Sequence, residues 1–196
     1  MARTSRLLGA LGLLLALMGL GAVATARTVA SAEMSPELKP GDTVWLLPLP
    51  VIRGDLVALR DPLDPERVVL RRAIAGPGQK VRYEDGQIRI EVKLVRQKDM
   101  GQEGAVRFLE ETMWSKPPAR ANTWVIQRQS PDVAWEHDAY TVPEGSWYLL
   151  ADDRDRALDS RWWGPIPESD FLGVVRLRYG PADAWRPGVE ILRPIP

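Results

Sequence analysis

The longest uninterrupted apolar stretch lies near the start of the chain. Residues 7–26 contain a single polar side chain, Thr25, and Arg3 and Arg6 precede them. A helix of about 20 residues rises roughly 30 Å, which is enough to cross the hydrocarbon core of a bilayer. Positive charge before the segment predicts residues 1–6 in the cytoplasm and residues 27–196 outside. We therefore expect a single-pass protein of the cytoplasmic membrane, with the lipid bilayer as a partner.

A cleaved signal peptide is the alternative interpretation of this segment. Residues 22–24 and 24–26 both fit a small-x-small cleavage site. The apolar run is longer than the usual 7–15 residues of a signal peptide, which favours an uncleaved anchor. Both interpretations place the folded part beyond the cytoplasmic membrane.

After residue 26 the pattern changes to short apolar runs separated by Gly, Pro and Asp, which is typical of a mostly β fold. A hairpin is predicted over 81–83 and 87–95, around Asp85 and Gly86. Residues 96–140 are expected to form an inserted β lobe, and the chain from 181 onward to be irregular. The other predicted strands are 43–47, 56–60, 67–75 (apolar without alternation, hence buried), 147–151 and 171–179.

Composition excludes several kinds of chemistry. The 26 basic and 26 acidic residues balance, so nothing indicates a nucleic-acid partner. The absence of Cys excludes disulfides, thiol catalysis and zinc–thiolate sites, and we expect no cofactor. The single histidine, His137, is interpreted as solvated surface rather than as a metal ligand. The acidic cluster that begins at Asp152 contains Arg154 and Arg156, which favours ion pairing, for example with Arg161, over calcium binding.

Four segments, in order, carry a resemblance to a known family. They read SAEMSPELKPGD (31–42), GDLVAL (54–59, with Pro62), VLRRAI (69–74, with GPG at 76–78) and ADDRDRALDSRWWGPIP (151–167). Together they resemble the boxes of type I signal peptidases, of which the last reads roughly GDNRDNS-x-DSR-x-WG. The resemblance implies a signal-peptidase-like complex β fold with one N-terminal transmembrane helix.

The resemblance also implies where the chemistry should lie. The family uses a Ser nucleophile and a neutral Lys base, with a second Ser that orients the Lys and another Ser at the oxyanion. Carried onto this chain, the oxyanion Ser is Ser31, whereas the nucleophile is Glu33, the base is Arg71 and the orienting Ser is Ala157. The positions that match the family, and to which we assign structural roles, are Asp152, Arg154, Asp159, Ser160 and Arg161.

These substitutions remove the known mechanism. Arginine stays protonated and is not a usable base. A carboxylate that attacked an amide would have to form an anhydride, which is uphill. Lys39 lies in the turn after the first box and Lys80 follows the Gly-Pro-Gly turn, so neither replaces the base. Ser31 and Ser35 flank Glu33 and could face the same side of an extended segment, but they too would need a base.

Three interpretations of function follow. The first is an inactive relative that binds exported preproteins or an active signal peptidase; a peptide would add as a strand beside Val29 and Ala30 on one side and Val69 and Leu70 on the other. The second is an active protease with atypical residues, and the third is a structural envelope domain.

Glu33 and Arg71 are expected to face each other as a charge-assisted ion pair, with bidentate geometry as one option. Two alternatives remain open. The two side chains could be solvated in a shallow groove, or Glu33 could act as a general base on water, although an adjacent Arg would lower its pKa.

Overall fold

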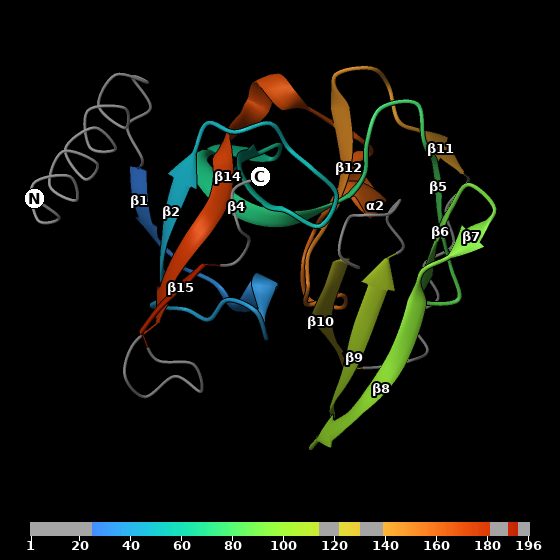
Figure 1. Ribbon diagram of the computed structural model, residues 1–196, viewed down its shortest axis with the longest axis horizontal. Helices are drawn as coiled ribbons and strands as arrows, with labels where there is room; N and C mark the ends of the chain where they lie inside the picture. The colour runs from blue at the N-terminus through green and yellow to red at the C-terminus, as the bar shows by residue number, and fades with distance from the viewer. Residues whose placement is uncertain (1–24, 114–121, 130–138, 181–187, 192–196) are drawn as a thin grey trace, which may run out of the picture.

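The computed structural model describes residues 25–113, 122–129, 139–180 and 188–191. Strands dominate these residues, which confirms the mostly β prediction (Figure 1). The predicted membrane segment lies outside them except for Thr25 and Ala26, which belong to the first strand, and His137 also lies outside. Within the described ranges, no helix has both the length and the apolar character needed to cross a bilayer.

The largest sheet is antiparallel and has eight strands within the described residues. β15 (Gly188–Ile191) pairs with β14, so the tail after residue 181 is not wholly irregular, and that prediction was wrong. The order of the remaining strands is β1 (Thr25–Thr28), β2 (Thr43–Leu47), β14 (Phe171–Gly180), β3 (Leu56–Asp61), β4 (Asp64–Ala75), β12 (Ser146–Leu150) and β13 (Ile166–Pro167).

Both faces of the central strands β3 and β4 are covered. On β3, Leu56 and Ala58 pack into one apolar cluster and Val57 and Leu59 into another. A strand that is buried on both sides has no polar face, so its sequence shows a continuous apolar run. The C-terminal half of β4 is buried in the same way, which explains why residues 67–75 do not alternate.

Two smaller sheets complete the fold. One has the order β11 (Tyr140–Thr141), β5 (Lys80–Glu84), β6 (Gln87–Ile90) and β7 (Lys93–Leu94); the other has the order β10 (Asn122–Arg128), β9 (Val106–Met113) and β8 (Arg96–Glu103). The second forms a lobe that extends away from the main sheet (Figure 1). The predicted strand 87–95 is broken, because Glu91 adopts a positive φ of 55° and the chain turns there.

Among the described residues, three short helices interrupt the strands. They are η1 (Ala32–Met34) in the first box, α2 (Ser160–Trp163) in the last box, and η2 (Glu168–Asp170) just after it. Since η1 is a 3₁₀ turn, the segment around Glu33 is not extended, and the alternation considered for Ser31, Glu33 and Ser35 does not occur. The α2 helix begins after Asp159, whose side chain accepts a hydrogen bond from the Arg161 backbone N–H.

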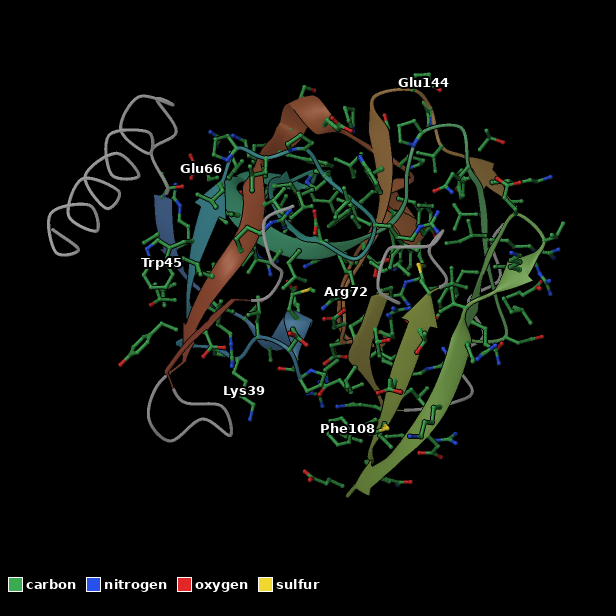
Figure 2. The ribbon with its side chains drawn as sticks, in the orientation of Figure 1. Lys39, Trp45, Glu66, Arg72, Phe108 and Glu144 are labelled. Carbon is green, nitrogen blue, oxygen red and sulfur yellow. The ribbon has the colours of Figure 1, made fainter. Side chains whose placement is uncertain are left out.

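The lobe is joined to the main sheet by a buried ion pair. Glu111 of β9 accepts a hydrogen bond of 2.6 Å from Arg154 of the last box, and both side chains are fully buried. The Trp124 indole N–H donates to the same carboxylate at 3.0 Å. The Arg72 guanidinium, from β4, lies over the Trp124 ring at 5.0 Å from its centroid. Figure 2 shows Arg72 at this junction, which therefore fixes the lobe next to the third and last boxes.

Candidate functional site

A cleft of about 340 Å³ opens beside η1. Its walls are residues 27–31, which continue from β1, and residues 67–71 of β4, while Met34, Val44 and Ala58 form an apolar floor. All four residues predicted to contact a peptide line this cleft: Val29, Ala30, Val69 and Leu70. The structure thus brings the two predicted walls together around one cavity.

Glu33 and Arg71 meet in this cleft. Arg71 Nη1 donates to Glu33 Oε2 at 3.1 Å, which confirms the predicted ion pair. The Arg71 side chain is 1% exposed and that of Glu33 is 18% exposed, so the pair is not freely solvated. Bidentate geometry does not occur, because a single Arg71 nitrogen contacts the carboxylate.

The rest of the Arg71 guanidinium is bound to backbone carbonyls. Nε and Nη2 donate to the Leu158 carbonyl at 2.9 and 2.6 Å, and Nη1 also donates to the Leu70 carbonyl at 2.6 Å. The Trp163 ring lies 5.4 Å from Arg71 Cζ, within the range of a cation–π contact. Arg71 therefore links β4 to the last box, in addition to neutralising Glu33.

The second oxygen of Glu33 is bound by Arg67, which sequence reasoning missed. Arg67 Nη2 donates to Glu33 Oε1 at 2.8 Å, and Arg67 Nη1 lies 3.5 Å from Asp61 Oδ2. A signal was present in the sequence: Arg67 and Arg71 are four residues apart on one strand, and alternation places both on the same face.

Ser31 joins the same cluster. Its hydroxyl donates to Glu33 Oε2 at 3.2 Å, so this oxygen accepts from both Ser31 and Arg71. Ser35 is directed elsewhere, because its hydroxyl donates to the Leu38 carbonyl at 3.4 Å and it does not line the cleft. Of the two serines that flank Glu33, only Ser31 therefore contacts the carboxylate.

Charge and burial act in opposite directions on the Glu33–Arg71 pair. Burial would raise the pKa of Glu33, but the charge of Arg71 and the hydrogen bond from Arg67 outweigh it and hold this pKa below its usual value. Burial lowers the pKa of Arg71, and the charges of Glu33 and Asp159 partly offset this. Glu33 is thus a weak base in this cleft.

Ala157 does not line the cleft and carries no polar group to it. It is 6% exposed and belongs to the same apolar cluster as Val29 and Met34. The lysines within the described residues are all exposed: Lys39, Lys80, Lys93 and Lys98. Figure 2 shows Lys39 on the loop after η1, pointing away from the body of the protein.

The last box holds the first one in place through its backbone. The Asp153 N–H donates to the Glu33 carbonyl at 3.0 Å. Ser160 Oγ accepts from the Leu149 N–H at 2.9 Å, and Asp159 Oδ2 accepts from the Ala151 N–H at 3.0 Å. These contacts fix the position of η1, and with it the backbone of Glu33, relative to the main sheet.

The acidic side chains of the last box form ion pairs, as predicted, but with a different partner for Asp152. It accepts two hydrogen bonds from Arg72, at 2.8 and 2.5 Å, rather than from Arg161. Arg161 instead pairs with Asp159 at 2.8 Å and donates to the Arg154 carbonyl at 2.6 Å. In the part of the chain that the structure describes, no group of three or more His, Cys, Asp or Glu side chains could hold a metal ion.

Comparison with known proteins places this arrangement in context. Residues 3–180 match the family described as signal peptidase, peptidase S26. A signal peptidase I of Pseudomonas aeruginosa is 28% identical over 170 residues, which cover 75% of this chain and 58% of that protein. A signal peptidase I of Streptococcus pneumoniae is 27% identical over 162 residues, covering 76% of this chain and 78% of that protein.

A crystal structure of a signal peptidase I from Enterococcus faecalis aligns with a TM-score of 0.40 and 24% identity, over 65% of this chain and 97% of that one. The chain spans 58% of the length of both Pseudomonas relatives that it matches, from P. aeruginosa and P. fluorescens.

Proposed function

The chain belongs to the signal peptidase family S26, and on that premise we propose that it is a member without protease activity that retains a peptide-binding cleft. We further propose that it is anchored in the cytoplasmic membrane by residues 7–26, with the cleft on the outer side. Its partner would be an exported preprotein, or an active signal peptidase that presents one.

The observation that carries this proposal is the state of the Glu33 carboxylate. Resemblance to the family assigns the nucleophile position to Glu33 and the base position to Arg71. The two side chains are 3.1 Å apart, and the other oxygen of the carboxylate lies 2.8 Å from Arg67. A carboxylate whose two oxygens each pair with a guanidinium group is stabilised as the anion and is therefore a poor nucleophile.

Proton transfer supports the same conclusion. A Ser nucleophile needs a neighbouring group that accepts its proton near neutral pH. Arg71 stays protonated, and the pKa of Glu33 is lowered by its two Arg neighbours, so neither accepts a proton readily. No lysine lines the cleft among the residues described.

The cleft nevertheless retains the features of a peptide site. Its two walls are strand-like segments with apolar side chains, and β1 is exposed along its length. An extended peptide could add beside these walls through backbone hydrogen bonds, with alternate side chains in the cavity. This combination of an intact cleft and an ion-paired centre is what an inactive binding protein requires.

Incubation of the full chain in detergent with a purified preprotein tests the proposal. We expect the preprotein to be captured and to stay uncleaved. Cleavage would contradict the loss of activity. If the preprotein is neither captured nor cleaved, the result contradicts peptide binding and favours a structural envelope domain.

One observation favours a second candidate, an active protease with atypical residues. The Ser31 hydroxyl donates to Glu33 at 3.2 Å, the arrangement of a nucleophile and its base. The lowered pKa of Glu33 opposes this candidate. If it is correct, any cleavage by the wild-type chain must disappear in Ser31→Ala and persist in Ser35→Ala, because Ser35 does not line the cleft.

A further inference from the structure

The charges that line the cleft are unequal. Among the described lining residues, three arginines (Arg27, Arg67 and Arg71) face one acidic residue, Glu33. Arg71 is almost fully buried, whereas the Arg67 side chain is 45% exposed and Arg27 is exposed. The charge that a ligand entering from solvent would meet is therefore positive.

Glu33 can offset only one of the three positive charges that line the cleft. Each of its two oxygens already lies within hydrogen-bond distance of a guanidinium group, Arg71 on one side and Arg67 on the other. Arg67 also lies near Asp61, but that contact is long, at 3.5 Å, and Asp61 does not line the cleft. The Arg67 guanidinium can therefore donate hydrogen bonds to a further anionic group that approaches from the solvent side.

The remainder of the cleft is small and apolar. Met34, Val44, Ala58 and Leu70 contribute to its lining beside the charged group. A volume of about 340 Å³ is near the lower end of the roughly 300–1,000 Å³ typical of ligand cavities. This space suits a few small residues of an extended chain rather than the surface of a folded protein.

We propose that the cleft binds the free C-terminal carboxylate of an extended peptide, paired with Arg67 and Arg27, with the preceding apolar residues in the cavity. The proposal rests on the peptide-binding function above and specifies its ligand as a cleaved chain end rather than an uninterrupted polypeptide. A continuous chain would present a neutral amide at this place, whereas a carboxylate forms charge-assisted, fork-like hydrogen bonds with guanidinium groups.

The test compares three labelled peptides by fluorescence anisotropy on the full chain in detergent. All three share an alternating apolar hexapeptide that ends in alanine. The first has a free carboxylate, the second is its C-terminal amide, and the third continues for several more residues. We expect the free acid to bind about tenfold more tightly than the other two, a difference of about 1.4 kcal/mol.

Two variants test whether Arg67 causes the preference for the free acid. Arg67→Gln should remove the preference for the free acid, so that the acid and the amide bind equally. Arg107→Gln is the matched control, because Arg107 is 46% exposed, is paired with Asp99 and lies on the lobe away from the cleft. It should keep the preference. A preference that survives Arg67→Gln would overturn the assignment of this residue.

The outcomes separate the two proposals. If the acid, the amide and the extended peptide bind equally, the carboxylate proposal fails and peptide binding stands. If none of the three binds to chain whose circular dichroism is that of folded protein, both proposals fail. The comparison of acid with amide uses the wild-type chain alone, so it remains decisive even if a variant does not fold.

Discussion

Glu33 and Arg71 lie 3.1 Å apart, yet three of the four hydrogen bonds that the Arg71 guanidinium donates go to backbone carbonyls. Two of these reach Leu158, in the last box, and one reaches Leu70. Arg71 thus bridges distant parts of the fold, and Glu33 is one of several groups that depend on it. The two partners should therefore contribute unequally to stability.

Urea unfolding of single alanine variants at Arg71, Glu33 and Arg67 tests that asymmetry. Arg71→Ala should lower the free energy of unfolding by roughly 3–5 kcal/mol, because it leaves buried acceptors unpaired. Glu33→Ala should cost less, about 1–3 kcal/mol, since Arg71 keeps its carbonyl partners. Arg67→Ala, at an exposed position, should cost roughly 0–1 kcal/mol. Equal losses for Arg71→Ala and Arg67→Ala would contradict the described geometry.

The pKa of Glu33 predicts how stability depends on pH. Its value in the folded chain is below the ordinary 4.5, so the ionised carboxylate is stabilised by folding. This contribution is complete above the unfolded-state pKa and is lost as the pH falls through the lower folded-state value. Unfolding of wild type and Glu33→Gln at about pH 7 and about pH 3 checks it. The advantage of the wild type should shrink at the acidic end, and a constant difference would argue against an ionised Glu33.

The buried ion pair between Glu111 and Arg154, which joins the lobe to the last box, leads to a separate prediction about stability. Glu111→Ala removes one partner of a fully buried pair and leaves Arg154 unpaired, which should cost roughly 3–5 kcal/mol in unfolding free energy. Glu110→Ala, at the preceding position of β9 where the side chain is partly exposed, is the control and should change stability by about 0.5 kcal/mol or less. A comparable loss in both variants would mean that the buried pair does not hold the lobe.

Occupation of the cleft can be tested by filling it. Leu70 lines the cavity and is partly buried, so Leu70→Trp should reduce the space available to a peptide. We expect preprotein affinity to fall at least about tenfold in a binding titration, the equivalent of about 1.4 kcal/mol. Leu63→Trp alters a residue that is 70% exposed and does not line the cleft, and it should bind like the wild type. Equal binding by both variants would place the peptide site elsewhere.

The sequence alone predicted the strands that carry the cleft, because their signals are local. The predicted strand 43–47 coincides with β2, and the apolar run 67–75 falls within β4. The contact between Glu33 and Arg71 followed from the family resemblance, which relates residues 38 positions apart. These features could be predicted since each depends on a short pattern or on a known spatial relationship.

Other structural features depend on contacts with residues that are distant in the sequence, and a local sequence pattern does not predict such contacts. Arg154 pairs with Glu111, which is 43 residues away on a lobe without family boxes. The tail strand β15 forms only because β14 offers it an edge. The extended conformation considered for the segment around Glu33 does not occur, because residues 32–34 form a 3₁₀ turn, and the Asp153 N–H donates to the Glu33 carbonyl. Each of these is a tertiary contact that overrides or supplements the local preference.

The residues at positions 33, 71 and 157 are proposed to be the reason that the chain does not cleave preproteins. The decisive measurement is preprotein cleavage by the wild type beside the variant Glu33→Ser, Arg71→Lys, Ala157→Ser, both as full chains in detergent. We expect no cleavage by the wild type and leader removal by the triple variant, since the latter supplies a nucleophile, a base and a group to orient the base. Cleavage by the wild type that is abolished in Ser31→Ala or Glu33→Ala would contradict the account.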